Sequence, residues 1–575
     1  MQRRTFVKSL LATAVSASLN TNFSTASANP SAGFVPVIDP VLVNIMMGGG
    51  PDFRHFIVPA MPGINGVLVP DQEKQQFAYL YWQFRSSVHR LTLPRGDYGS
   101  DQDYLLAQEE SWRSRWNDDF IHFDLNTFAG SENAERNPVY IGQNTTTNVF
   151  GIWQGAGWLV QMFSEGKVAI VANVVGATHR AHDHATLQIN QGNLLSNVDD
   201  GGRSGWGGRL ATQAQGTSIA LTDTPSPFAF GPVTSPSYQP DLIDNSNLVP
   251  IQNSRDLGLR EADLDQDQSN RPDFALARTL KSYYSALKQE TLAPVYENFT
   301  GHEEQLRLLG QQMSAQLDFN VPDEIRALYS QTLDRTKVLG GALEANPRHH
   351  FNNDSMGNSR RVCYNENWGS QVRNLYDSLA ANNVLGLKVA SMEYNLEWDS
   401  HSQQRKNIDV PDLKDPYINR GIESSFKDIF GGPTDSNTTE LHYGLSALWH
   451  NLDTTSKQNI TFVAAGEFGR QIRANGDFGT DHGAANIMLL IGEQVNGGVY
   501  GELFQDDEVE KYTDPTLFTP DITPRTEFDH LFAAACDHIS PNSGEVVFPR
   551  TSGGYLGVAP QLESLGLFTN LFRVT

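Results

Sequence analysis

The sequence predicts an α/β protein with a mainly parallel central sheet, flanking helices and a partly helical insertion. Five short apolar runs are hydrophobic on both faces, as expected of strands that are buried inside a parallel sheet. These runs are Val41–Met47, Val168–Val175, Leu385–Met392, Ile460–Ala465 and Ile487–Ile491. Helical patterns separate some of them, such as Leu441–Leu452 ahead of the fourth run. Strands that alternate with helices are typical of α/β folds.

The middle of the chain has a different composition. Residues 222–250 are rich in Pro, Ser and Asn, which is a loop signature, and an acidic polar segment follows at Asp256–Asp273. Helical patterns then occur at Phe274–Leu292 and His302–Leu317. We therefore expect one α/β domain over residues 29–575, with residues 223–380 as an approximate loop and helical insertion within it.

The first 28 residues have the pattern of a secretion signal. The charged start contains the adjacent pair Arg3 and Arg4, an apolar run follows at Ser9–Leu19, and Ala26–Ala28 offers small residues for cleavage. The apolar run is about half of the ~20 residues that a membrane-spanning helix needs. The arginine pair is typical of twin-arginine (Tat) signals, although any basic start can contain two arginines. We expect residues 1–28 to be a Tat signal peptide and the mature chain to be periplasmic or secreted.

Composition excludes several classes of partner. The net charge is -24, from 42 basic and 66 acidic residues, and no basic block is present, so we expect no nucleic-acid partner. After residue 28 no uncharged apolar stretch is long enough for a membrane span. Cys363 and Cys536 are too few for a disulfide scaffold, and both a pair and two buried thiols remain open. Protein partners and oligomeric state cannot be read from this composition.

Clusters of Gly, His and acidic residues lie next to the predicted strands. They are Gly48–Asp52, Thr178–His184, Trp398–His401, Gly466–Arg470 and Gly479–Gly483. Ligands of open α/β sheets bind at the carboxyl ends of the strands, so these clusters should converge in space. The second cluster contains three histidines, and Asp399 and His401 are two residues apart, so both can point the same way in an extended chain.

Mixed imidazole and carboxylate groups predict a site for one or two divalent ions, with zinc, manganese, iron and calcium all open. The candidate metal ligands are Asp52, His182, Asp399, His401, Glu467 and His482. If they share a site, their side chains should lie within about 10 Å of one another. Arg470 is a candidate for binding an anionic group, because a guanidinium can bind phosphate, sulfate or carboxylate oxygens bidentately. Each cluster alone also fits a structural role, such as a glycine turn, surface histidines at a helix start or a Glu467–Arg470 ion pair.

Together the motifs resemble the DUF1501 family. They are the Tat-like start, Gly48–Asp52, Arg180–His182, Trp206–Arg209, Trp398–His401, Glu467–Arg470, Gly479–Gly483 and Tyr555–Val558, in this order. That family is of uncharacterised function and is placed in the alkaline phosphatase/sulfatase superfamily. The resemblance implies a parallel-sheet core and a two-metal site for tetrahedral anions. By analogy, Asp52 and the region of Glu467 would serve one metal. Asp399, His401 and His482 would serve the other.

Two positions depart from the superfamily pattern. Its phosphatases have Asp-His where this chain has Glu467 and Phe468, so one ligand is lost. Its nucleophile is Ser or Thr at the second strand end, where the family's common Arg-Ser-His here has Ala181, which cannot attack an ester. Neither cysteine has the context of a formylglycine sulfatase, and the sequence has no zincin motif, serine-hydrolase elbow or P-loop.

Two functions remain open on this sequence. One is a metal-dependent hydrolase of phosphate or sulfate esters that uses metal-activated water, with His182 or Glu467 as general base and Arg470 stabilising the anion. The other is a non-catalytic periplasmic binding or structural protein with a relic metal or anion pocket. Both predict a small anionic substrate or ligand, but neither the motifs nor the fold class identifies it.

The export prediction can be tested by replacing Arg3 and Arg4 with Lys. Because the Tat receptor reads the arginine pair rather than its charge, the Lys-Lys variant should remain in the cytoplasm of a bacterial host. Cell fractionation measures this directly. Normal periplasmic levels of the variant would contradict the Tat assignment and leave general secretion.

Overall fold

The computed structural model of the protein describes the chain in segments. These are residues 37–63, 67–125, 149–194, 196, 204–222, 225–232, 243–244, 248–251, 351–352, 359–360, 366–380, 382–395, 398–405, 421–431, 444–514, 521–548 and 571–573. The predicted signal peptide, the acidic segment and helices of the predicted insertion, Cys363 and the motif Tyr555–Val558 lie outside the described residues.

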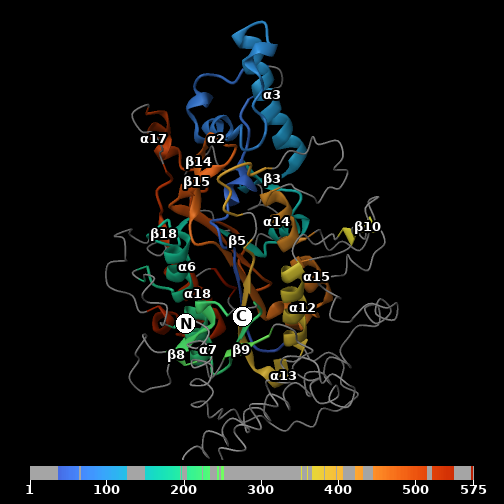
Figure 1. Ribbon diagram of the computed structural model, residues 1–575, viewed down its shortest axis with the longest axis vertical. Helices are drawn as coiled ribbons and strands as arrows, with labels where there is room; N and C mark the ends of the chain where they lie inside the picture. The colour runs from blue at the N-terminus through green and yellow to red at the C-terminus, as the bar shows by residue number, and fades with distance from the viewer. Residues whose placement is uncertain are drawn as a thin grey trace, which may run out of the picture.

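Nine strands of the described chain form one central sheet (Figure 1). They are β1 Val41–Met46, β5 Val168–Val175, β6 Thr217–Ala220, β9 Leu248–Pro250, β12 Leu387–Glu393, β13 Ile460–Ala465, β16 Ala485–Ile491, β17 Gly498–Tyr500 and β18 Thr526–Glu527. The order is β17-β5-β16-β13-β1-β12-β6-β9, and β18 also pairs with β5. Every pair is parallel except the two pairs made by β16, which is antiparallel to β13 and β5.

Apolar runs account for the strands of this sheet, because β1, β5, β13 and β16 are buried at every residue. β5 and β13 have the predicted bounds, β1 ends one residue earlier, and β16 begins two residues earlier. β12 begins two residues later than predicted because the short helix α13, Asn382–Leu385, precedes it. The predicted α/β class with a mainly parallel sheet and flanking helices is confirmed. Within the predicted insertion, β9 is the edge strand of this sheet next to β6.

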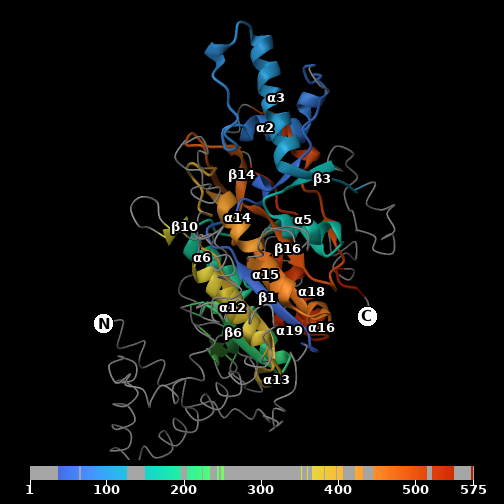
Figure 2. The ribbon, with the colours of Figure 1, turned by 90° about the vertical axis from the view of Figure 1, so that its right-hand side faces the viewer.

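Helices cover both faces of the sheet (Figure 2). One hydrophobic core contains Val43 and Ile170, and the other contains Leu42 and Val171, because neighbouring residues of a strand point to opposite faces. The first core is covered by α5 Gly157–Ser164, α12 Glu366–Ala380, α14 Ile422–Phe430 and α15 Gly444–Asn451. The second core is covered by α6 His182–Gln191, α7 Trp206–Gln213, α18 Phe528–Ile539 and α19 Gly544–Val547. None of the described helices is long and apolar enough to span a bilayer.

A smaller layer stands over the end of the sheet where β1 and β13 finish (Figures 1 and 2). It consists of η1 Phe53–His55, β2 Ile57–Pro59, α2 Phe77–Arg85, α3 Asp101–Asp119, β3 Phe120–Asp124 and β4 Val149–Trp153, with the antiparallel order β2-β4-β3. The antiparallel hairpin of β14 Gly469–Ala474 and β15 Thr480–Gly483 joins this layer beside α2. The sequence patterns did not predict this hairpin.

A bulge bends β5 close to its carboxyl end. Between its pairs with Asn486 and Met488, β5 advances from Val174 to Val171, so it carries one residue more than β16. Asn173 lies in this bulge, is fully buried, and has a left-handed backbone with φ of 54°. Its side chain accepts a hydrogen bond from the guanidinium of Arg54. The bulge therefore sets the direction in which the histidine-rich segment leaves the sheet.

Substitution of Asn173 should separate the backbone requirement from the hydrogen bonds. Asn173→Gly should lower the free energy of unfolding by about 1.5–3 kcal/mol, because the bond from a charged group is lost. Asn173→Val should cost about 1–2 kcal/mol more, because a residue with a Cβ resists the left-handed region. Urea unfolding measures both values. Equal losses in the two variants would show that the backbone conformation imposes no cost.

Candidate metal centre

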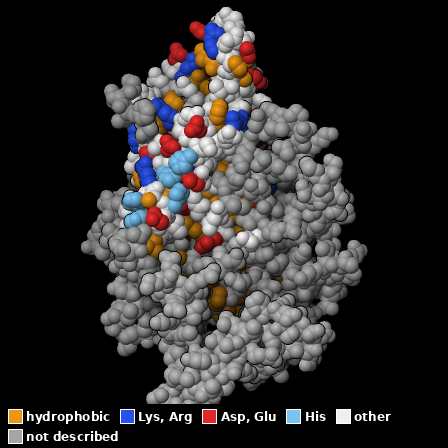
Figure 3. Space-filling model, in the orientation of Figure 1, with side chains coloured by type: hydrophobic (Ala, Val, Ile, Leu, Met, Phe, Trp, Pro, Cys, Tyr) orange, Lys and Arg blue, Asp and Glu red, His pale blue; other side chains and the backbone are white. Residues whose placement is uncertain are grey.

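Five of the six predicted ligands converge at one edge of the central sheet. His182, Asp399 and Glu467 come from segments that follow β5, β12 and β13, whose carboxyl ends lie at the same edge. His482 belongs to β15, which precedes β16. Because β16 runs antiparallel to its neighbours, its beginning lies at the edge where they end, and His482 is therefore brought to the same place. Figure 3 shows histidine and acidic side chains gathered on this face.

Three imidazoles surround one carboxylate oxygen in this cluster. Oδ1 of Asp399 lies 3.1 Å from Nε2 of His401, 3.3 Å from Nε2 of His482 and 3.4 Å from Nε2 of His182. The ligand atoms of His182, Asp399 and His482 all lie within 4.8 Å of one another. His401 is outside that set of three, although its Nε2 is only 2.8 Å from Nε2 of His482.

Each imidazole is oriented through its other nitrogen. Nδ1 of His182 is 2.8 Å from Oε1 of Glu467, and Nδ1 of His401 is 3.0 Å from Oδ1 of Asp481. Nδ1 of His482 is 2.8 Å from the backbone carbonyl of Arg180. A backbone carbonyl and an ionised carboxylate can only accept hydrogen bonds. The N–H hydrogen of each imidazole is therefore assigned to Nδ1. Each Nε2 then presents a lone pair toward Asp399, as in metal-binding histidines.

Electrostatics keeps Asp399 ionised and His482 neutral. Burial alone would raise the pKa of Asp399, but Arg470, through its hydrogen bond and its charge, outweighs this effect and lowers that pKa to about 2. Burial, helped by the charge of Arg470, lowers the pKa of His482. The hydrogen bond to Glu467 raises the pKa of His182. A carboxylate and an uncharged imidazole are the protonation states that a cation requires of its ligands.

The spacing and the unmatched atoms of the cluster fit a cation. Ligand bonds of ~2.0–2.1 Å in tetrahedral geometry place ligand atoms about 3.3 Å apart, close to the distances from Asp399 to His182 and His482. Nε2 of His182 and Oε2 of Glu467 are buried and have no hydrogen-bond partner within the described chain. A buried polar atom without a hydrogen-bond partner lowers the stability of the folded state. A bound group that contacts both atoms would remove this cost.

Asp52, the sixth predicted ligand, does not join the cluster. Its buried carboxylate forms an ion pair with Arg85, and Nε2 of Gln404 donates to its Oδ2 over 2.6 Å. Burial would raise the pKa of Asp52, but Arg85 reverses that effect and lowers it. Oε1 of Gln404 accepts hydrogen bonds from Ser400 at 2.9 Å and Thr480 at 2.8 Å. Asp52 is therefore connected to the ligand-bearing segments through Gln404 rather than directly.

Arg470 lies beneath the cluster, and its side chain is fully buried. Its guanidinium donates to the backbone carbonyls of Gly49, Gly50, Trp398 and Thr480. It also donates to Oδ1 of Asp399 over 2.8 Å. In this position Arg470 fixes Asp399 and joins two loops and strand β15, and its side chain has no exposed surface for an anion.

The glycines after β1 allow the loops to approach the cluster closely. Gly49 has φ of +119°, and its N–H donates to Oε1 of Glu467 over 2.8 Å. A Cβ at Gly49 would lie 2.8 Å from the backbone nitrogen of Asp399. Phe468 packs its ring against the rings of His182 and His482, with centroids 5.0 and 4.3 Å away. Phe468 therefore helps to hold two of the clustered histidines in place.

Sequence reasoning missed several residues of this site. Asp481 and Arg180 lie within two of the sequence motifs, but no role was predicted for them. Their only signal was their closeness in the chain to His482 and His182. His179 and His184 stack on each other 4.7 Å apart and do not join the cluster. Nδ1 of His179 accepts the N–H of Ala181, at the start of α6.

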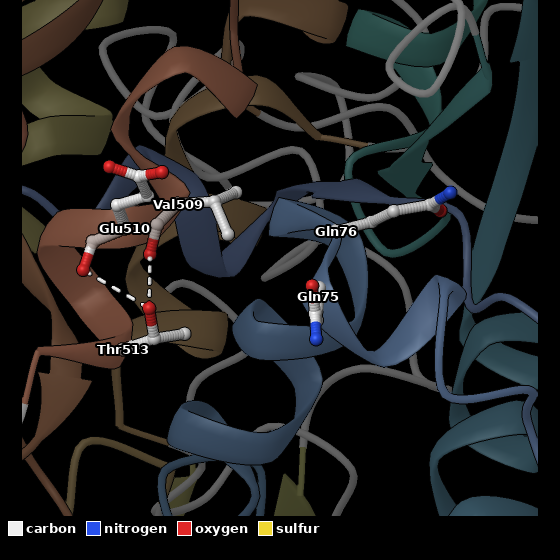
Figure 4. A pocket seen from close by; sticks show the side chains of 5 residues that line it. All are labelled: Gln75, Gln76, Val509, Glu510 and Thr513. Atoms are coloured by element: carbon white, nitrogen blue, oxygen red, sulfur yellow. Dashed lines mark hydrogen bonds between the residues drawn. The ribbon is translucent and has the colours of Figure 1, made fainter.

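Other polar features of the described chain lie in different elements. A surface groove between η2, Glu73–Gln75, the start of α2 and α17, Val509–Thr513, is lined by Gln75, Gln76, Val509, Glu510 and Thr513 (Figure 4). None of these residues belongs to the histidine cluster. A second buried group, Glu527, Asp529 and His530, lies at the start of α18.

Glycine substitutions should show how tightly the loops are packed. Gly49→Ala should lower the free energy of unfolding by about 2–5 kcal/mol, because strain at positive φ adds to overpacking against Asp399. Gly476, in the turn between β14 and β15, is the matched control, since nothing lies within 4 Å of its added Cβ. Gly476→Ala should change the free energy by about 1 kcal/mol or less. Urea unfolding that gave equal values would contradict the close approach of Gly49.

Comparison with known proteins identifies the family. No curated protein and no solved structure matches the chain. The family described as "Protein of unknown function (DUF1501)" matches residues 161–530, which include His182, Asp399, Glu467 and His482 but not Asp52. Because this match covers more than half of the chain, the protein belongs to the DUF1501 family.

Proposed function

We propose that this protein is an exported, divalent-metal-dependent hydrolase of phosphate or sulfate esters with an alkaline phosphatase-like fold. One observation carries the proposal: three imidazole Nε2 atoms face a single carboxylate oxygen of Asp399 over 3.1–3.4 Å. The position of the cluster at the carboxyl edge of a mainly parallel sheet supports it, since ligands of such sheets bind there. The superfamily and the Tat signal at residues 1–28 rest on the sequence motifs.

His182, Asp399 and His482 would hold the ion, with His401 beside them. A divalent ion bound there supplies Lewis acidity toward an ester oxygen and lowers the pKa of water. Glu467 and the carbonyl of Arg180 orient His182 and His482 through Nδ1. Zinc fits the mixture of nitrogen and oxygen ligands, and manganese, iron and calcium remain open.

His401 is the residue best placed to move a proton. Its Nδ1 is bonded to Asp481, which leaves Nε2 as the basic atom, and its side chain is 42 % exposed. The hydrogen bond from Asn475, followed by that from His401, lowers the pKa of Asp481, so this carboxylate stays ionised. A carboxylate that orients a histidine is the usual arrangement of a general base.

The chemistry then needs no side-chain nucleophile. Water attacks the phosphorus or sulfur atom, the bond to the leaving oxygen breaks, and Nε2 of His401 takes a proton from the water and returns it to the leaving oxygen. Ala181 immediately precedes α6 at the position of the phosphatase nucleophile and has no hydroxyl. Direct attack by water is consistent with that alanine.

A non-catalytic binding or structural role is the second candidate. It is favoured by two observations: Ala181 lacks the nucleophile of the superfamily, and Arg470 is buried among backbone carbonyls. A protein with this role would use the same residues to hold the ion, but it would not turn over esters.

Metal removal tests the proposal. The purified parent should contain a divalent metal by mass spectrometry, and a chelator should lower its Tm, because a ligand that binds only the folded state stabilises it by about 2.7 kcal/mol at a hundred times Kd. His482→Ala should lose the metal and the response to chelator. His184→Ala is the matched control, since His184 is outside the cluster, and it should keep both.

The same preparations separate the two roles. Turnover of an aryl phosphate or an aryl sulfate that is lost in His482→Ala supports the hydrolase. A parent with a full metal content and no turnover of either ester supports the binding role instead. If the parent carries no metal and a chelator does not change its Tm, both the hydrolase and the metal-binding role are contradicted.

A further inference from the structure

The half-exposed guanidinium of Arg180 lies beside the histidine cluster. We infer that Arg180 recognises the anionic group of the ligand, with Asp521 as its fixed counter-ion. The inference rests on the proposed function, because it names the anion-binding group of the same site. The side chain of Arg180 is 47 % exposed, whereas that of Arg470 is fully buried.

Arg180 is attached to the cluster by its backbone and its side chain. Its carbonyl accepts the hydrogen bond from Nδ1 of His482 over 2.8 Å. Its Nη1 donates back to the carbonyl of His482 over 3.1 Å. It also lies two residues before His182 in the chain. The guanidinium is therefore held next to two of the three residues that would bind the ion.

The guanidinium of Arg180 keeps donors for a ligand. Two of its N–H groups are used in the described contacts, one to His482 and one to Asp521, and an arginine has five. Arg470, by contrast, makes five hydrogen bonds to protein oxygens. The fork of an exposed arginine matches two oxygens of a tetrahedral anion such as a phosphoryl or sulfuryl group.

Asp521 is fixed in place by the backbone around it. Its Oδ2 accepts the N–H of Ala484 over 2.8 Å, and its Oδ1 accepts the N–H of Ile522 over 2.8 Å. Oδ2 also accepts the hydrogen bond from Nη2 of Arg180 over 2.6 Å. Asp521 therefore positions the guanidinium and offsets part of its charge, which weakens its attraction for anions. Removal of that negative charge should strengthen anion binding.

The test is calorimetric titration of the full-length mature protein with inorganic phosphate and, separately, with inorganic sulfate, after metal content is measured. Arg180→Ala should bind the preferred anion about ten- to a hundredfold more weakly, as expected for the loss of charge-assisted hydrogen bonds. Arg180→Lys, which keeps the charge but not the fork, should lie between. Asp521→Asn should bind the anion several times more tightly. Arg525→Ala is the control, because Arg525 pairs with Asp507 and should not change binding.

The outcomes are separable. Opposite effects of Arg180→Ala and Asp521→Asn at unchanged metal content support the inference, because loss of a merely structural contact would weaken binding in both. Parental affinity in Arg180→Ala with the metal retained overturns the inference and leaves the proposed function standing. A parent without metal defeats the proposed function, and anion binding that still weakens in Arg180→Ala then supports the inference alone. If Arg180→Ala lowers the Tm strongly, the anion affinity of Arg180→Lys is compared with that of the parent instead. Weaker binding at unchanged metal content supports the inference, and parental affinity overturns it.

Discussion

The buried guanidinium of Arg470 is the contact on which the arrangement of the cluster depends. It joins the loop after β1, the loop after β12 and strand β15 through their backbone carbonyls, and it holds Asp399. A buried charge is tolerated only when hydrogen bonds replace its water. The carbonyls must therefore converge on Arg470 whenever the chain is folded, and this convergence brings Asp399 to the histidines. The positive charge of Arg470 beneath the cluster is compensated by Asp399.

Strand direction provides the second constraint. If β16 were parallel to its neighbours, the segment before it, with Asp481 and His482, would lie at the opposite edge of the sheet. The hairpin of β14 and β15 resolves this geometry: the chain leaves β13 at the carboxyl edge, turns back on itself and enters β16 from the same edge. The bulge at Asn173 lies in β5, which is the neighbour of β16 in the sheet. It bends the end of β5, from which the segment of His182 continues toward that hairpin. The antiparallel strand β16 and the bulge in β5 therefore both lie beside the histidine cluster.

Much of the fold and most of the cluster could be predicted from the sequence, and the failures have physical reasons. Continuous burial leaves a clear apolar signature, so the runs for β5 and β13 were found with their observed bounds. An apolar run carries no information on strand direction, so the reversal of β16 was missed. Likewise, a carboxylate next to glycines has the same signature whether it faces a cation or a guanidinium. Asp52 is paired with Arg85, which lies in a helix that no motif connected to the strand ends.

The tautomers of the histidines determine what the cluster can accommodate. With every Nδ1 tied to an acceptor, the Nε2 atoms of His401 and His482 face each other at 2.8 Å with two lone pairs, which repel unless a proton or a cation lies near both. A shared proton would relieve this pair, but it would leave Nε2 of His182 and Oε2 of Glu467 without a hydrogen-bond partner in the described part of the chain. A divalent ion near Asp399 neutralises the carboxylates and engages the lone pair of His182 at the same time. The proposed divalent ion would therefore satisfy both the charge and the hydrogen-bond balance of the cluster.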